Sequence, residues 1–204
     1  MATVGGVAIS TASLEHWILA EAVLKWRTIP LEKAPLGVLP DPPRFTECIE
    51  WLGSAAGPVH ERALSVAQRK TNCERLLQEV TRKTLEFLIT DQWYKGEVRD
   101  KHIDVSEAEV QTNLNDYIEQ AITGRHDYEK YLSATGMSEA DFLFVQRRFT
   151  NWEKIRQEIL DKPHPAEVTP ALEQFTSKWV SKTSCQPGYV VPGCRQYHGP
   201  LPTP

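Results

Sequence analysis

The chain has 204 residues, a net charge of −4 at neutral pH and an isoelectric point of about 5.9. Its hydrophobic share of 41% and charged share of 25% are those of an ordinary globular protein with a real core. The acidic balance argues against a nucleic-acid-binding protein, which usually carries a basic face. No apolar run approaches the roughly 20 residues of a membrane span.

The N-terminal part predicts a short β element and two helices. From Thr3 to Ile9 apolar residues alternate around a Gly-Gly pair, which is typical of a strand or hairpin. Ser10 and Thr11 are candidate N-caps of the helix that follows. Prolines then crowd the segment 30–44, which predicts an irregular loop before a short helix that carries Cys48.

A long helix is expected next. Between Val59 and Ile103 there is no proline, only Gly96 interrupts the pattern, and apolar residues recur at steps of three and four. A helix of this length should act as a spine on which other helices pack.

Two further helices have closely similar starts. Ser106 with Glu109 and Ser138 with Asp141 both match the capping box, although Asp is shorter than the usual Glu or Gln. A short helix is expected between them over 128–134.

The C-terminal part is expected to contain one helix and one strand. Thr169 and Pro170 have the order of an N-cap and a first helical residue. Tyr189 to Val191 is apolar and β-branched and predicts a strand, and Pro192-Gly193 predicts a turn.

Four cysteines fall into two local pairs, Cys48 with Cys73 and Cys185 with Cys194. If both pairs form disulfides, the protein works in an oxidising compartment, and the first bridge contributes roughly 3 kcal/mol in the chain-entropy model. The alternative is four separate reduced thiols. None of the cysteines forms a CxxC, and no histidine stands at zinc-ligand spacing from them, so no metal site is expected.

The ordered series of Thr3 to Ile9 before a helix, the long helix, Ser106 to Val110, Tyr128 to Leu132 and Met137 to Asp141 resembles the SurA N-terminal domain. More closely, it resembles the bacterial SurA- and PrsA-like foldases, secreted or lipid-anchored peptidyl-prolyl isomerase chaperones. The likeness covers most of 3–160, and the ending 179–197 is similar to the C-terminal tail of one branch of these foldases. The resemblance implies a mainly α fold: a SurA-N-like helical domain with a long spine helix. A small β element would be formed by the N-terminal strand and the returning C-terminal tail.

The sequence departs from that family in one respect. The foldases carry a parvulin isomerase domain between the last helix of the N-terminal domain and the tail, and here only 163–169 separates the two. The expected organisation is a chaperone domain over 1–162, a linker over 163–169, a returning helix and disulfide hairpin over 170–198, and a disordered tail over 199–204. No Gln-x-Gly-Gly segment is present either, so no catalytic residue is assigned and no enzymatic activity is expected.

Motifs for nucleotide, metal or other cofactor binding are not found, and no cofactor is expected. Aromatic residues on an apolar helix face are mostly buried in the core, but helices arranged as a cradle could leave some of them exposed for contact with a client. The candidates for client contact are Trp93, Tyr94, Phe142 and Phe144.

The first functional hypothesis is an ATP-independent holdase that binds unfolded or secreted polypeptides in the cell envelope. The alternative is an envelope structural or adaptor protein with one defined partner. A third hypothesis is an enzyme, either a degenerate isomerase or one that obtains its isomerase domain from another chain. An extracytoplasmic location is expected from the cysteines and the resemblance. Met1 to Gly6 lacks the basic and apolar regions of a signal peptide, so the export signal is expected to be missing from this sequence.

Overall fold

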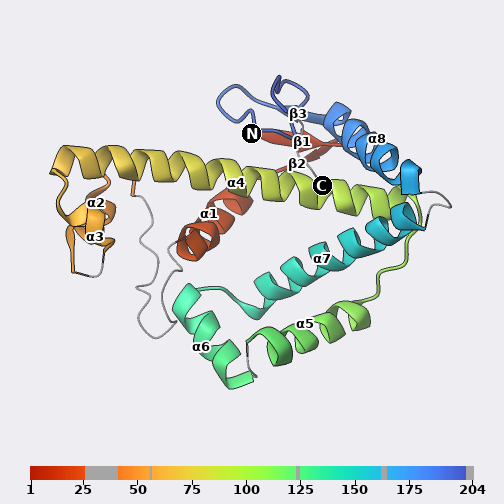
Figure 1. The fold of residues 1–204 in the computed structure, drawn as a ribbon, viewed down its shortest axis with the longest axis horizontal. Coiled ribbons are helices and arrows are strands. Elements are labelled where there is room, and N and C mark those ends of the chain that lie inside the picture. Colours follow the sequence, from red (N-terminus) through yellow and green to blue (C-terminus); the bar gives the residue numbers. More distant parts are fainter. Residues whose placement is uncertain (26–40, 56, 123–124, 162–164, 201–204) are drawn as a thin grey trace. The chain divides into compact units, whose positions relative to one another are not determined.

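The structure of the protein, a computed structural model, describes residues 1–25, 41–55, 57–122, 125–161 and 165–200. Three expected segments extend outside these residues: the loop 30–44 up to residue 40, the linker at 163–164, and the tail at 201–204. The described part is mainly helical with a small three-stranded sheet, which confirms the coarse fold class (Figure 1). In chain order the elements are β1 (Ala2–Val4), β2 (Val7–Ala8), α1 (Thr11–Lys25), α2 (Thr46–Gly53), α3 (Val59–Arg62), α4 (Val66–Asp100), α5 (Glu107–Ala121), α6 (Arg125–Thr135), α7 (Glu139–Leu160), the 3-10 turn η2 (Pro165–Glu167), α8 (Val168–Ser181) and β3 (Thr183–Cys185).

The chain forms two compact units, and α4 runs through both. The first unit comprises 1–11, 85–129 and 138–204, and the second comprises 12–84 and 130–137. The first therefore contains the sheet, α5, α7 and α8, and the second contains α1, α2 and α3.

In the second unit a disulfide fastens α2 to α4. Cys48 and Cys73 have Cα atoms 6.1 Å apart and a bonded sulfur pair, and they form a small core with Phe45 and Leu52. All four residues expose 6% or less of their surface. The expected pairing of these cysteines is therefore the one that the structure contains.

The expected long helix is interrupted near its start. Residues Val59–Arg62 form the separate helix α3, and α4 begins only at Val66. The reason is local: Ser65 Oγ accepts from the backbone N–H of Gln68 at 3.3 Å, and Gln68 Oε1 accepts from the Ser65 N–H at 2.9 Å. This reciprocal capping box starts a new helix.

In the first unit the small sheet has the order β2-β1-β3, with both pairings antiparallel. Gly5 and Gly6 make the hairpin turn with φ of +54° and +87°, a region that glycine enters without strain. The C-terminal segment returns to the opening strand, as expected, with Ala2 opposite Cys185 and Val4 opposite Thr183.

The returning strand lies earlier in the chain than expected. It comprises Thr183–Cys185, and Tyr189 to Val191 is not a strand, which corrects the sequence-based prediction. Those three residues lie inside the loop closed by the Cys185–Cys194 disulfide, where the Val191 N–H donates to Cys194 Sγ at 3.2 Å. Within this loop the Tyr189 N–H donates to the Gln186 carbonyl and the Cys194 N–H donates to the Val191 carbonyl, so the backbone forms turns in place of a strand ladder.

Two helix pairs organise the rest of the first unit. Helices α4 and α7 run in the same direction, since Phe87 lies near Phe144 and Tyr94 near Trp152. Helices α5 and α7 run in opposite directions (Figure 1), because the residues that meet are Glu109 with Lys154, Asn113 with Thr150 and Tyr117 with Phe142.

The starts of α7 and α5 are those that the sequence predicts. At α7 the capping box is complete despite the short Asp side chain, and at α5 the Ser106 hydroxyl accepts from the Glu109 N–H. Helix α6 spans Arg125–Thr135, and Gly136 follows it with φ of +66°. Helix α8 begins at Val168 after the 3-10 turn, so Thr169 is not its cap. Pro170 instead lies in the first turn, where its missing N–H removes no helical hydrogen bond.

Candidate functional site

The four aromatic residues selected from the sequence lie in or near the core of the first unit. Trp93, Tyr94 and Phe142 expose 1%, 5% and 6% of their surface, so they offer no area to a client in this structure. Trp93 is held from several sides: its Nε1 donates to Thr183 Oγ1 at 2.8 Å, and its ring centroid lies 6.4 Å from that of Phe175. These three side chains are thus buried in the structure, while Phe144 is half-buried, and client contact by the four residues stays a prediction.

An aromatic layer joins α4, α7 and α8. The rings of Tyr94 and Trp152 stack at 5.1 Å with an interplanar angle of 24°, and Phe175 lies 6.2 Å from Tyr94 and 5.9 Å from Trp152. Such offset stacks add to the free energy gained from apolar burial. The layer explains why these side chains are inside: each covers another.

Arg148 of α7 lies inside this layer. Its guanidinium stands 4.8 Å from the Phe87 ring and 5.0 Å from the Tyr94 ring, and it donates to Thr90 Oγ1 at 2.8 Å. All three partners belong to α4. Burial lowers the pKa of Arg148, while the nearby Tyr94 and Asp91 act in the opposite direction. The side chain therefore acts as a desolvated cation that binds α7 to α4.

Asp91 is the buried acid of the same layer. Its side chain is 1% exposed, and Oδ2 accepts from Lys95 Nζ at 2.8 Å and from Gln92 Nε2 at 3.2 Å. Among the described residues Oδ1 has no hydrogen-bond partner. Burial raises the pKa of Asp91, and the hydrogen bond from Lys95 and the charges of Lys95 and Arg148 oppose that rise. These groups face one another, which suits a positioning role more than catalysis.

The exposed aromatic residues of the first unit lie elsewhere, on α5 and α7. Phe149 exposes 53% of its surface and Tyr117 exposes 40%. Phe142, Val145 and Phe149 are spaced by three and four residues along one side of α7, and the Tyr117 ring lies 6.4 Å from that of Phe142. Phe142 itself is buried, so we call Tyr117, Val145 and Phe149, which are exposed or half-buried, the apolar row.

The sequence does not separate this row from the buried part of α7. Along the helix the apolar residues follow one another at steps of three and four, which predicts a single apolar face made of Phe142, Val145, Phe149, Trp152, Ile155 and Ile159. In the structure Ile155 and Ile159 expose 4% or less of their surface, whereas Phe149 exposes 53%.

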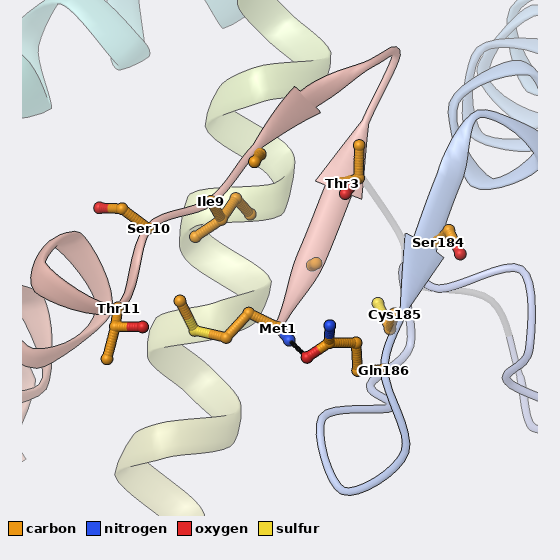
Figure 2. A pocket seen from close by; sticks show the side chains of 10 residues that line it. Met1, Thr3, Ile9, Ser10, Thr11, Ser184, Cys185 and Gln186 are labelled. Carbon is orange, nitrogen blue, oxygen red and sulfur yellow. Dashed lines mark hydrogen bonds between the residues drawn. The ribbon is translucent and has the colours of Figure 1, made fainter.

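A polar hollow of about 570 Å³ lies over the sheet (Figure 2). Thr3, Ala8 and Ser184 stand side by side across the three strands beneath it, and Ser10 and Thr11 line one edge. At the opposite edge the Gln186 side chain accepts a hydrogen bond from the Met1 amino group. The lining offers hydroxyl and amide groups, and it contains no carboxylate or lysine among the residues described.

Within the described ranges no three His, Cys, Asp or Glu side chains come together in a way that could hold a metal ion. In the same part of the chain, no helix combines the length and the apolar character needed to cross a membrane. Comparison with protein-family models, with curated proteins and with solved structures finds no match to this chain.

Proposed function

We propose that the protein is an ATP-independent, chaperone-type module that binds apolar stretches of unfolded or secreted polypeptides through the apolar row. The observation that carries the proposal is Phe149, a phenylalanine with 53% of its surface exposed on a helix whose other side is buried. Burial of apolar area is non-directional, so such a surface accepts clients of differing sequence. Within this proposal, Phe149 and Tyr117 are the client contacts in place of the residues named from the sequence.

Three further features support an envelope foldase-like reading. Helix α4 provides a spine of 35 residues, and the C-terminal strand pairs with the N-terminal one, as the SurA- and PrsA-like resemblance implies. Two cysteine pairs lie at disulfide distance, which suits an oxidising, extracytoplasmic compartment. The chain is proposed to act without the isomerase domain of that family.

A second candidate is an adaptor that binds one defined partner. The burial of Trp93, Tyr94 and Phe142 favours it, because a closed core leaves a limited apolar surface for contact. A small patch suits a single complementary partner better than a wide range of clients.

The deciding experiment is light scattering of several chemically unfolded, unrelated clients diluted into buffer with stoichiometric protein. A holdase suppresses aggregation of most of them, and Phe149→Ser weakens the suppression because it removes the largest exposed ring of the row. Val66→Ser is the matched control, since Val66 is 62% exposed but lies in the second unit. No suppression of any client sinks the holdase proposal and leaves the adaptor.

Absence of enzymatic activity is part of the proposal and has its own test. A proline-containing peptide substrate is incubated with the pure protein, and cis–trans isomerisation is followed against buffer alone. We expect equal rates. A faster rate that survives further purification would revive the degenerate-isomerase hypothesis.

A further inference from the structure

A second pocket, of about 350 Å³, lies between three helices of the first unit. Helix α4 contributes Glu97 and Lys101, spaced by one turn, and α7 contributes Ile159 near its end. Helix α8 contributes one face, formed by Ala171, Gln174, Phe175 and Lys178. One wall is thus apolar and the other is charged.

The charged wall is formed by two ammonium groups, of Lys101 and Lys178, and by the carboxylate of Glu97. Glu97 Oε2 already accepts from Trp179 Nε1 and from Lys178 Nζ, both at 2.7 Å, while Lys101 Nζ stands 3.8 Å from Oε1. The side chain of Glu97 is only 6% exposed, so its carboxylate interacts with these partners and not with solvent.

Both lysines can still reach an additional anion. Their side chains are 37% and 33% exposed for Lys101 and Lys178, and their other partners, Glu158 at 2.9 Å and Asp100 at 3.1 Å, lie at the surface. Surface ion pairs of this kind contribute about 0–1 kcal/mol each. An anion that also gains apolar burial can replace them.

We infer that this pocket binds a small amphipathic carboxylate, with its head group at Lys101 and Lys178 and its hydrocarbon part against Ile159, Ala171 and Phe175. Ile159 and Phe175 expose 4% and 5% of their surface, so the apolar wall is a fixed part of the core. The volume lies at the low end of ligand pockets, which run from about 300 to 1,000 Å³. It fits a short chain and excludes a large ligand.

The probe is octanoate, titrated into the full chain by calorimetry and followed by amide NMR shifts. We expect saturable binding, with shifts at the pocket-lining residues of α4 and α8. Lys101→Gln should weaken binding about tenfold or more, and Ala171→Leu should abolish it by filling the pocket. Lys154→Gln, a lysine of α7 outside the pocket, should leave it unchanged. Thermal unfolding of each variant checks that the fold is retained.

Two comparisons identify the ligand chemistry and its source. Octylamine, with the same chain and the opposite charge, should not bind. A short peptide that ends in leucine with a free carboxylate is compared with the same peptide as a C-terminal amide, to test whether the end of a polypeptide can supply the carboxylate. If the free acid binds more tightly than octanoate, a polypeptide C-terminus is the source of the ligand. Equal binding of octanoate and octylamine, or octanoate binding unaffected by both Lys101→Gln and Ala171→Leu, would overturn the inference.

This inference is independent of the proposed function. Its residues are different from those of the apolar row, and Phe149→Ser should leave octanoate binding unchanged. Loss of client binding and loss of carboxylate binding can therefore be told apart.

Discussion

Asp91 keeps a carboxylate inside the aromatic layer of the first unit, where Lys95 is its closest cation. Transfer of a carboxylate from water to the interior is unfavourable unless its oxygens are satisfied, and here only Oδ2 has hydrogen-bond partners in the described structure. Arg148, which is half-buried in the same layer, provides a second positive charge. The layer therefore fixes α7 on α4 at some cost in free energy.

The stability of the protein should depend on pH through Asp91. Because burial raises its pKa above the usual 3.8, the folded chain holds this proton more tightly than the unfolded chain. Its contribution to the free energy of unfolding should therefore fall as pH rises from about 4 through the raised pKa. In urea unfolding, the free energy of unfolding of Asp91→Asn should rise relative to that of the wild-type protein as pH increases.

The comparison between the two proteins isolates Asp91. The hydrogen bond from Lys178 and the neighbouring Lys182 lower the pKa of Asp100. The contribution of Asp100 to the free energy of unfolding is therefore lost as pH falls, which is opposite in sign to the effect of Asp91. That contribution is common to both proteins and cancels in the difference. Parallel stability curves between pH 4 and pH 7 would contradict the prediction.

Gly96 is the one glycine inside the long helix α4, and its position is explained by Trp179. A Cβ atom at residue 96 would overlap with the indole ring of Trp179, which is itself 2% exposed and bonded to Glu97. The glycine lets α8 approach the helix closely.

Gly96→Ala should lower the stability of the protein. Alanine gains about 1 kcal/mol in helix propensity, but overpacking of a buried site costs about 1–3 kcal/mol. Chemical unfolding measures the net loss. When Trp179 is also replaced by leucine, Gly96→Ala should lower the free energy of unfolding by less than it does in the wild-type background. An equal loss in both backgrounds would show that overlap with the Trp179 ring is not the cause.

At the scale of elements, the starts of α5 and α7 differ in one detail. At α7 the box is reciprocal: Ser138 Oγ accepts from the Asp141 N–H at 3.2 Å, and Asp141 Oδ2 accepts from the Ser138 N–H at 2.8 Å. At α5 the Glu109 carboxylate is instead directed to Lys154, 2.8 Å away. The sequence motif is similar, but neighbouring helices decide whether the second half of the box forms.

Asp141→Ala should therefore lower stability by about 1 kcal/mol, because it removes half of a capping box. Ser138→Ala should cost at least as much as Ser106→Ala, which breaks the single cap bond of α5. Urea unfolding of the three variants provides the test. A smaller loss for Ser138→Ala than for Ser106→Ala would mean that the reciprocal bond adds no stability.

At the scale of the whole molecule, each disulfide lies within one compact unit. Cys48–Cys73 ties α2 to the first half of α4 in the second unit, and Cys185–Cys194 closes the C-terminal loop in the first. The loop between Cys48 and Cys73 spans 25 residues, whereas the other spans 9. In the chain-entropy model the longer loop gives the larger stabilisation.

Replacement of Cys48 and Cys73 by alanine should destabilise the second unit by about 3 kcal/mol. Amide hydrogen exchange should speed up first in α2 and in the residues of α4 around Cys73. The Cys185→Ala, Cys194→Ala protein is the control, in which faster exchange should begin in β3 and the loop that follows it. The same pattern of exchange in both variants would contradict an assignment of each disulfide to its own unit.

The sequence by itself determined the helical class, the N-terminal hairpin, the two serine caps and the cysteine partners. These depend on local physics: periodic apolar residues, a Gly-Gly turn, side chains that bond the first turn of a helix, and cysteines close in the chain. The break at Ser65 was equally local, since Ser65 and Gln68 carry the same signal.

Only the tertiary structure decided which C-terminal residues form the strand and which aromatic side chains are covered. Thr183 to Cys185 pairs with Ala2 to Val4, and the Thr183 hydroxyl donates to the Trp179 carbonyl and accepts from the Trp93 indole, which lies 90 positions away in the chain. Phe142 and Phe149 share one side of α7, yet the first exposes 6% and the second 53%. Burial depends on which neighbouring element covers a side chain, and periodicity along one helix does not contain that information.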